Sequence, residues 1–242
     1  MRVIIHERCQ KQNKRANILS PRTVLRKSDL RRTVLGDACI CDILFSMIIV
    51  GLGNPGEEYE GTRHNTGRVI VTAFAKKISA DDFVFDKKSN ALVSFAKVGK
   101  TKVTFVLPET FMNKSGNAVG CFVKSMKAAK DLIVVHDDLD IALGRIKMSF
   151  NKSSGGHKGV ESVMRAVKTE SFWRLRVGIS QSSASGKLKV PKGDKLITDF
   201  IVAKWKPSEV DEMKKVTKKA VEALTLAATD GFEKAMMVAN QN

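Results

Sequence analysis

Three histidines beyond residue 46 stand in polar or glycine-bearing sequence: His64 in TRHNTG, His136 in VVHDDLD and His157 in GGHKG. An imidazole has an ordinary pKa suited to proton transfer near neutral pH, and a general base contributes about 10² to 10⁴ in rate. Asp137 ends a strongly apolar run, and a carboxylate there can fix an imidazole tautomer and stabilise its cation. Each histidine alone also fits a helix cap or a hydrogen-bonded loop residue.

Asparagine side chains gather in similar loops, at Asn54, Asn65, Asn113 and Asn117. A neutral amide can hold a carbonyl or an oxyanion without competing for the proton, and one such donor is worth about 3 kcal/mol in a transition state. The sequence contains no G-x-S-x-G nucleophile elbow, and Cys121 lies in an apolar helical pattern. We therefore expect water to be the attacking group, although each asparagine alone also fits a turn or cap.

The run GLGNPG, from Gly51 to Gly56, matches the G-x-G-x-x-G pattern of dinucleotide-binding loops. Such a loop needs its third glycine to open a helix whose N-terminus holds a pyrophosphate. Here a proline precedes Gly56 and glutamates follow it, and their charges would repel a pyrophosphate. The loop fits better as a support that lifts Asn54 clear of a sheet. A nicotinamide or flavin enzyme is the weaker interpretation, and no cofactor is expected.

The elements that must position these residues follow an α/β pattern, in which short β-branched runs alternate with amphipathic stretches. Strands are expected at 48–52, 91–98, 101–107, 132–135, 145–150 and 172–179, and the second and third should form a hairpin around Gly99 and Lys100. Helices are expected from an N-cap at Thr62 to residue 78, at 115–127, at 160–167 and onward from Pro207. Residues 182–194 should form a loop. The continuous apolar run 132–135 is typical of a strand buried on both faces, whose end delivers His136 and Asp137.

The first 46 residues differ from the rest. They hold ten Lys or Arg and four acids, a net charge of +6, and three of the four cysteines, but no sustained hydrophobic period. Cys9, Cys39 and Cys41 do not follow a recognised zinc-finger spacing, so no metal is expected. We predict that residues 1–46 form a basic extension, disordered or created by a start-site error at Met47, and that residues 47–242 form the catalytic domain. A targeting peptide and a functional basic arm are the alternatives.

The whole chain is basic, with 42 Lys plus Arg against 25 Asp plus Glu and a net charge of +17 over 242 residues. Such a surplus favours a polyanionic partner because Lys and Arg release counterions when they meet phosphates, although a generally basic surface explains it equally well. An apolar share of 43% is enough for one core. The longest apolar runs are far below the roughly 18 to 20 residues that cross a bilayer, so no membrane span is expected.

Several separate motifs together resemble the bacterial-type peptidyl-tRNA hydrolase family. They are MIIVGLGNPGEEYEGTRHNTG, LPETFMNKSG, LIVVHDDLD, GRIKMSFNKSSGGHKG and FWRLRVGI, in that order, and the match covers essentially all of the chain from Met47. The resemblance implies a single globular α/β domain with a twisted mixed sheet flanked by helices, acting as a cytoplasmic monomer without a metal. The implied activity is hydrolysis of the ester that joins a peptide to the 3′-terminal ribose of tRNA, which recycles tRNA in translation.

The resemblance also implies roles for single residues. It makes His64 the base that activates water and Asp137 its partner. It assigns Asn54 and Asn113 to holding the peptide backbone or the reacting carbonyl, and it places Met112 beside the scissile group. Tyr59, in the E-Y position, matches a residue near the tRNA-ester end of the cleft.

One position departs from the family pattern. The family commonly reads G-G-H-N-G where this chain has His157 followed by Lys158, so a lysine replaces an asparagine that often assists water or substrate. An ammonium donates hydrogen bonds but cannot accept them, and its charge would lower the pKa of His64. We expect His157 and Lys158 to contact substrate, and Lys158 could instead contact the tRNA backbone.

Basic residues near these motifs are the expected tRNA contacts. They are Arg145, Lys147, Lys152, Arg174 and Arg176, with the lysine face of the last helix as a weaker candidate. The alternative to an enzyme is a non-catalytic RNA-binding module on the same scaffold, since a fold does not fix a function. The joint presence of Asn54, His64, Asn113 and Asp137 argues against that module because binding alone does not need them.

Overall fold

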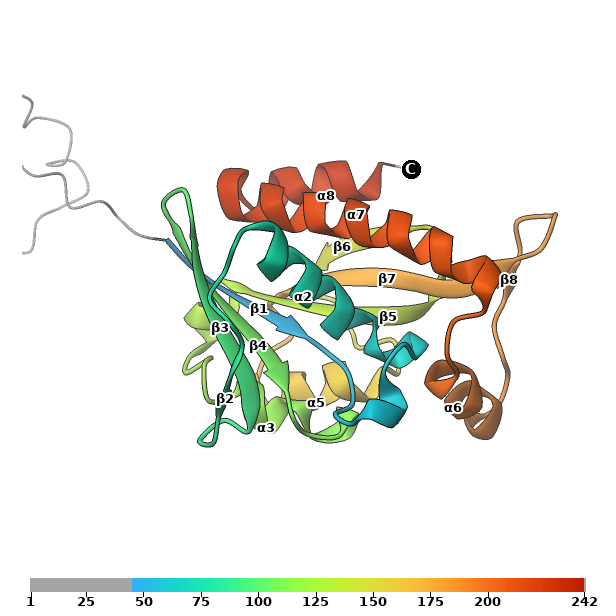
Figure 1. Cartoon of the computed structure of the whole chain (residues 1–242), viewed down its shortest axis with the longest axis horizontal. Coiled ribbons are helices and arrows are strands. Elements are labelled where there is room, and N and C mark those ends of the chain that lie inside the picture. Colours follow the sequence, from blue (N-terminus) through green and yellow to red (C-terminus); the bar gives the residue numbers. More distant parts are fainter. Residues whose placement is uncertain (1–44, 242) are drawn as a thin grey trace, which may run out of the picture. The chain divides into compact units, whose positions relative to one another are not determined.

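A mixed β-sheet forms the middle layer of the protein in this computed structural model, which describes residues 45–241 (Figure 1). The predictions for residues 1–44, including the three cysteines there, lie outside the described residues. The strand order is β2-β3-β4-β1-β5-β7-β6, and β8 pairs with β7. The strands are β1 (Phe45–Gly51), β2 (Val84–Asp86), β3 (Ala91–Val98), β4 (Thr101–Pro108), β5 (Leu132–Ala142), β6 (Ile146–Phe150), β7 (Trp173–Ser182) and β8 (Leu188–Lys189).

The four central strands β4, β1, β5 and β7 are parallel, while β3 and β6 pair antiparallel to the outer members of that group. The expectation of a mixed sheet is therefore confirmed. The hairpin of β3 and β4 around Gly99 and Lys100 is also confirmed, with Val98 opposite Thr101. Parallel central strands need both faces covered, which explains their nearly continuous apolar sequences.

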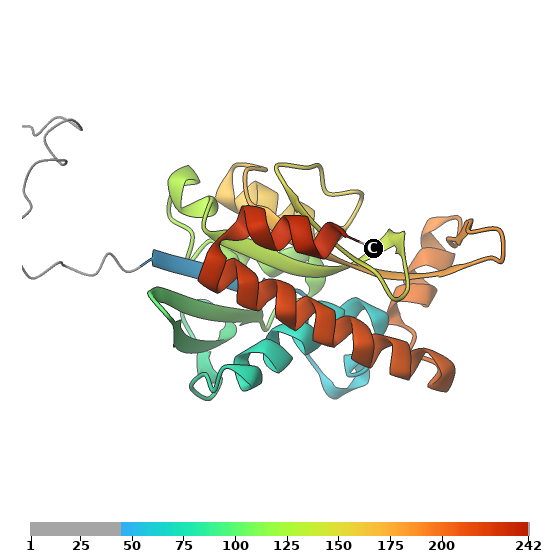
Figure 2. The ribbon, with the colours of Figure 1, turned by 90° about the horizontal axis from the view of Figure 1, so that it is seen from above.

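Helices cover both faces of the sheet (Figure 1). They are α2 (Thr66–Lys77), α3 (Ser115–Val119), α4 (Met126–Ala129), α5 (Lys158–Val167), α6 (Asp194–Val202), α7 (Pro207–Asp230) and α8 (Phe232–Asn240). Buried side chains of α2, α7 and α8 form one core with one face of the sheet, and those of α3 and α5 form a second core with the other face. Seen from above, α7 and α8 lie across the sheet (Figure 2). Among the described residues, no helix combines the length and the apolarity needed to cross a bilayer.

The sheet changes direction of growth at β1. After β1 the chain builds β2, β3 and β4 on one side, and it then returns to add β5 on the other side. In open α/β sheets the crevice at such a switch point, outside the carboxyl ends of the strands, is where ligands bind. The pairing of β1 with β5 ends with Gly51 opposite Val135, and β5 continues to Ala142. His136 and Asp137 therefore lie beyond the end of β1.

Close backbone packing joins α2 to this crevice. A Cβ on Gly67 would lie 2.2 Å from the carbonyl oxygen of Val135 and 2.6 Å from that of Leu52, so only glycine fits there. The Arg68 amide donates to the Leu52 carbonyl at 3.1 Å. The first turn of α2 is thus held directly against the ends of β1 and β5.

Several predicted boundaries are wrong for local reasons. The expected helix at 115–127 is two short helices, since Gly116 lies within the first, Gly120 caps its C-terminus, and Ser125, in extended conformation, caps α4 with its side chain. The helix expected from Thr62 begins as a 3₁₀ turn, η3 (Arg63–Asn65), before α2, and the Thr62 hydroxyl donates to the Tyr59 carbonyl instead of capping. Part of the expected loop at 182–194 is strand β8. Cys121, expected in a helix core, lies in the turn after α3 and is partly exposed.

Candidate active site

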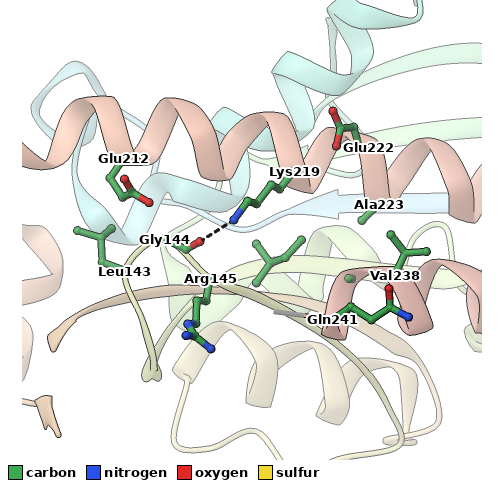
Figure 3. Close-up of a pocket in the computed structure, with 11 residues that line it drawn as sticks. Leu143, Gly144, Arg145, Glu212, Lys219, Glu222, Ala223, Val238 and Gln241 are labelled. Atoms are coloured by element: carbon green, nitrogen blue, oxygen red, sulfur yellow. Dashed lines mark hydrogen bonds between the residues drawn. The ribbon is translucent and has the colours of Figure 1, made fainter. Parts of the chain in front are cut away.

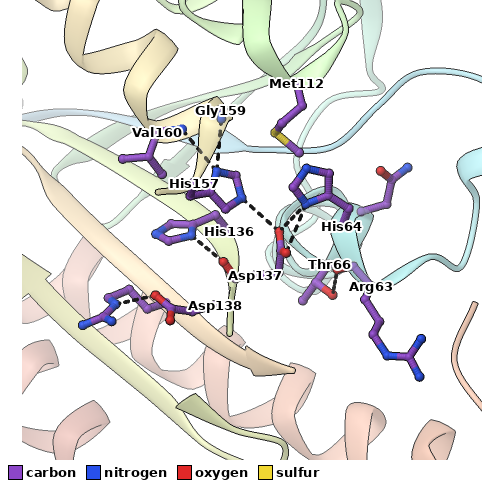
Figure 4. A network of polar contacts seen from close by, with 12 residues as sticks. Arg63, His64, Thr66, Met112, His136, Asp137, Asp138, His157, Gly159 and Val160 are labelled. Carbon is purple, nitrogen blue, oxygen red and sulfur yellow. Dashed lines mark hydrogen bonds and ion pairs between the residues drawn. The ribbon is translucent and has the colours of Figure 1, made fainter. Parts of the chain in front are cut away.

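A single carboxylate, that of Asp137, lies at the centre of the polar cluster beyond the end of β1 (Figure 4). Ile133 and Val135 belong to the core beneath α2 and α7, and alternation along β5 directs Asp137 to that same face. The residue is 2% exposed. A carboxylate buried to this degree must be paired and hydrogen-bonded.

His64 reaches Asp137 from the 3₁₀ turn that precedes α2. Its Nδ1 lies 3.0 Å from Oδ1 and 3.1 Å from Oδ2 of Asp137. Because a carboxylate only accepts hydrogen bonds, Nδ1 carries the proton and Nε2 of neutral His64 keeps its lone pair. The predicted pairing of His64 with Asp137 thus has hydrogen-bonding geometry, and it leaves Nε2 in the form of a base.

His157 binds the same carboxylate from the N-terminus of α5. Its Nε2 lies 3.1 Å from Oδ1 of Asp137, and its Nδ1 accepts from the amides of Gly159 and Val160 at 3.2 and 3.3 Å. The side chain therefore caps α5 with Nδ1 and donates to Asp137 from Nε2–H. The ring centroids of His64 and His157 are 5.1 Å apart.

His136 points to the opposite face of β5 from Asp137, and it is a hydrogen-bonded structural residue. Its Nδ1 donates to the Asp137 carbonyl at 2.7 Å, and its Nε2 is buried without a hydrogen-bond partner among the described residues. Burial lowers the pKa of His136 to about 3, and the positive charge of Arg174 acts in the same direction. His136 is therefore neutral and poorly suited to act as a general base near pH 7.

Opposing effects set the pKa of His64. Burial lowers it, but the charge of Asp137 and the hydrogen bond to that carboxylate outweigh burial, while the ammonium of Lys158 acts to lower it, so the net pKa lies above the ordinary value. Burial raises the pKa of Asp137, but the charges of His64 and His157 and their hydrogen bonds hold it well below the ordinary range. Asp137 is consequently an anion at all moderate pH values.

The three side chains also have the spacing of a metal-binding group, since one ligand atom from each of His64, Asp137 and His157 lies within 4.8 Å of the others. A metal on Nε2 of His157 would require a proton on Nδ1, because ligating histidines donate from their second nitrogen. That Nδ1 instead faces two amide donors. The donor set therefore fits a hydrogen-bonded cluster better than a metal centre.

Asn54 and Met112 are joined beside this cluster. The backbone amide of Met112 donates to Asn54 Oδ1 at 2.8 Å. The side chain of Asn65 binds the backbone of Asn54, because its Oδ1 accepts from the Asn54 N–H at 2.8 Å and its Nδ2 donates to the Asn54 carbonyl at 2.9 Å. The sequence named Asn65 among the amides that could hold a carbonyl or an oxyanion, but it did not predict that Asn65 binds the backbone of Asn54. Met112 is 5% exposed, and its sulfur lies so close to Gly159 that a Cβ there would be 2.4 Å from it. Asn54 is thus tied to η3, the turn that carries His64, and Met112 packs against the first turn of α5, which follows His157.

The other predicted residues lie at the surface. Asn113 is exposed in the 3₁₀ turn η4 (Met112–Lys114), and its side chain has no hydrogen-bond partner among the described residues. Tyr59 is partly exposed in η2 (Glu57–Tyr59). Lys158 is exposed at the first position of α5. None of these three side chains forms a hydrogen bond or ion pair with His64 or Asp137.

The predicted tRNA contacts separate into two places. Lys147 lies opposite Arg176 and Ser149 opposite Arg174 on neighbouring strands, while Arg176 donates to Asp138 at 2.7 Å. Arg174 is 3% exposed, and burial lowers its pKa. Arg145 instead lines a groove of about 410 Å³ between the β5–β6 turn, α7 and α8 (Figure 3), whose lining residues include no member of the His64 cluster.

Comparison with known proteins gives one consistent result. The family model described as "Peptidyl-tRNA hydrolase" matches residues 48–242. A "Peptidyl-tRNA hydrolase" of Desulfitobacterium hafniense is 35% identical over 195 residues, which are 80% of this chain and 99% of that protein. One of Herpetosiphon aurantiacus is 39% identical over 196 residues, covering 80% and 89%. The crystal structure of peptidyl-tRNA hydrolase from Acinetobacter baumannii superposes with a TM-score of 0.72 at 29% identity, covering 81% of this chain and 94% of that one.

Replacing Asp137 by asparagine should lower the pKa of His64 below its ordinary value, because the substitution removes the attractive charge and leaves burial to act. The pKa can be measured by an NMR pH titration of the His64 ring protons. Asp138→Asn is the matched control, since Asp138 is the next acid along β5 and is not a cause of the His64 shift. An unchanged His64 titration in Asp137→Asn would contradict the assigned pairing.

Proposed function

The chain belongs to the peptidyl-tRNA hydrolase family, and we propose on this basis that it hydrolyses the ester between a peptide, or an N-blocked aminoacyl group, and the 3′-terminal ribose of tRNA. The observation that carries the proposal is the pairing of His64 Nδ1 with Asp137 at 3.0 Å. This pairing leaves Nε2 unprotonated in the neutral ring, as a base for water must be. A binding module would have no use for such a base.

In the proposed reaction, Nε2 of His64 takes a proton from water as the water oxygen attacks the ester carbonyl. The bond between the carbonyl carbon and the ribose oxygen then breaks, and the imidazolium returns its proton to that oxygen. Peptide and free tRNA are the products. Asp137 stabilises the imidazolium between the two steps, which its low pKa supports because it stays an anion.

Amide donors are proposed to hold the reacting carbonyl. The side-chain oxygen of Asn54 accepts from the backbone amide of Met112. Its NH₂ group has no partner among the described residues. Asn113 is exposed on the next turn with its whole amide free of such partners. Donors fixed before the reaction stabilise developing negative charge without reorganisation. Met112 supplies an apolar wall, and the peptide is expected beside it.

The tRNA is proposed to lie along β6, where Lys147 is exposed, and along the start of α5 at the exposed Lys158. Arg174, which the sequence predicted as a tRNA contact, is only 3% exposed on β7 and is therefore left out of this row. Tyr59, in η2, and Arg145, which directly precedes β6, remain candidate contacts. All members of the catalytic cluster come from one chain, which supports action as a monomer. Because peptidyl-tRNA arises in translation, the cytoplasm is the proposed location.

His64→Ala should lower hydrolysis of an N-blocked aminoacyl-tRNA by about 10² to 10⁴, because the base is lost, while tRNA binding persists. Release of free tRNA and binding by filter retention would be measured on the same preparations. Lys76→Ala, an exposed change at the far end of α2, is the control and should keep full turnover. Tight binding without turnover in the unmodified protein would favour the alternative of an RNA-binding module.

Lys158→Asn should move the acid limb of kcat/KM to higher pH. The ammonium lowers the pKa of His64, so its removal raises that pKa and the active neutral form appears only at higher pH. Lys168→Asn, at the opposite end of α5 in a left-handed conformation that asparagine tolerates, is the control. Coincident pH profiles for Lys158→Asn and the unmodified protein would rule out this electrostatic role.

The double variant Lys147→Ala and Lys152→Ala should weaken tRNA binding and reduce the slope of log K against log salt by about 2, one for each lost phosphate contact. Both lysines are exposed and form no ion pair among the described residues. Lys76→Ala with Lys77→Ala is the matched control, because both lysines are exposed in the last turn of α2 and neither is a predicted tRNA contact. Equal slopes for the first pair and the unmodified protein would remove Lys147 and Lys152 from the interface.

A further inference from the structure

The residue before the proposed base, Arg63, is one of the most buried charges among the described residues. It lies in η3 and is 3% exposed. Burying a guanidinium is costly unless its charge and its donors are satisfied. The reaction proposed above gives Arg63 no chemical step, so its burial needs another explanation.

Arg63 is held by contacts from a distant part of the chain. One terminal nitrogen donates to Glu209 at 2.6 Å. The other is shared by the carbonyls of Phe200, Ala203 and Lys204 at 3.4, 3.2 and 3.2 Å. The guanidinium carbon also lies 4.5 Å from the ring centroid of Phe200 and 5.0 Å from that of Trp205. These partners belong to α6, to the start of α7 and to the segment between them.

Glu209 extends the connection. It accepts from Gln181, near the end of β7, at 2.8 Å and from the Lys206 amide at 2.9 Å, which caps α7. Burial raises the pKa of Glu209, but the cap, Gln181 and Arg63 outweigh it and lower the pKa. The ion pair thus joins three elements: the turn η3, the N-terminus of α7 and the end of β7.

Backbone contacts run beside the ion pair. The Arg63 amide donates to the Ala203 carbonyl and the Trp205 amide to the Gly61 carbonyl, each at 3.2 Å. Thr62 and Lys204 form an isolated β-bridge. The short turn η3 is therefore anchored on the side away from Asp137 by the segment between α6 and α7.

We propose that Arg63 is a positioning residue that, through Glu209 and the α6–α7 segment, fixes the turn carrying His64 so that Nδ1 stays on Asp137. This inference rests on the proposed function. An arginine suits the task because its planar fork donates in two directions at once, whereas a lysine offers a single compact ammonium. A three-residue 3₁₀ turn has few hydrogen bonds of its own, so an external anchor must set the direction of its side chains.

A purely stabilising role for Arg63 makes a different prediction. A buried ion pair adds little net stability over an apolar pair of the same size, but losing one partner is destabilising. A loss of stability alone lowers the amount of folded enzyme and leaves the kcat of the folded fraction unchanged. A positioning role lowers kcat in folded protein, because misplacement of a catalytic group by about 1 Å can cost 10²-fold.

The test is Arg63→Lys in the full chain, which keeps the charge and removes the fork. We expect kcat for hydrolysis of an N-blocked aminoacyl-tRNA to fall by about 100-fold with KM within about twofold. The far-downfield NMR signal of the His64 Nδ1 proton should weaken as well. Thr101→Val is the control, since it removes a buried hydrogen bond to the Ala228 carbonyl at 2.7 Å, away from the site. Its kcat and its His64 signal should stay those of the unmodified protein.

Glu209→Gln keeps Arg63 and is the second variant, used if Arg63→Lys does not fold; it should lower kcat in the same direction. The proposal is overturned if Arg63→Lys folds and keeps the kcat and the His64 signal of the unmodified protein. If Arg63→Lys does not fold, the same result for Glu209→Gln overturns it. An equal loss of kcat in Thr101→Val would overturn it as well. If the unmodified protein does not hydrolyse the substrate, the proposed function fails, and the His64 signal alone then decides. Its loss in Arg63→Lys supports positioning, and its retention overturns it.

Discussion

The site depends on one constraint, which is that the buried Asp137 carboxylate must be satisfied by donors from outside its own strand. At 2% exposure it cannot rely on water, and β1 ends before it, so no neighbouring strand covers it on that side. His64 and His157 fill this need from two elements that lie on opposite faces of the sheet. The carboxylate therefore does more than support one histidine, because it fixes the positions of both the turn before α2 and the N-terminus of α5.

Each of the two histidines is fixed by a different physical device. His157 is part of a helix cap, so its ring is set by the amides of Gly159 and Val160 and its tautomer follows from that cap. His64 lies in a 3₁₀ turn, held on one side by Gly67 packing against Val135 and on the other by the segment around Ala203. The difference suits their proposed tasks. Nδ1 of His157 is already occupied by two amide donors, whereas Nε2 of His64 has no such partner among the described residues.

The sequence singled out His64, Asp137 and His157, which the structure brings together, but it did not show how they are held. The apolar run before His136 predicted a central strand, and the resemblance to a known family implied the pairing of His64 with Asp137. The predicted strand ended at residue 135, whereas β5 reaches Ala142. The later positions carry acids, which favour loops in an isolated sequence, and pairing with β7 keeps them extended in the structure. The glycines that broke the expected helix at 115–127 were visible, but Gly116 is there for a contact with Ser162 that no local pattern contains. The link from Arg63 to Glu209 spans 146 residues, and neither end has a sequence signal that points to the other.

The ion pair of His64 and Asp137 has different consequences for stability and for the proposed chemistry. The pKa of His64 is raised in the folded protein, so its protonation stabilises the fold below the ordinary pKa of about 6.5, and this contribution is lost as the pH rises through the raised value. The pKa of Asp137 is lowered, so its ionisation stabilises the fold above the ordinary carboxyl range and the contribution is lost only in strong acid. A base must be neutral before it can act, so the active form of His64 is the one that has given up its part of the ion-pair stabilisation. What then holds the ring is the hydrogen bond from Nδ1 and the packing of its turn, which is why the surroundings of η3 carry so many contacts that the chemistry itself does not use.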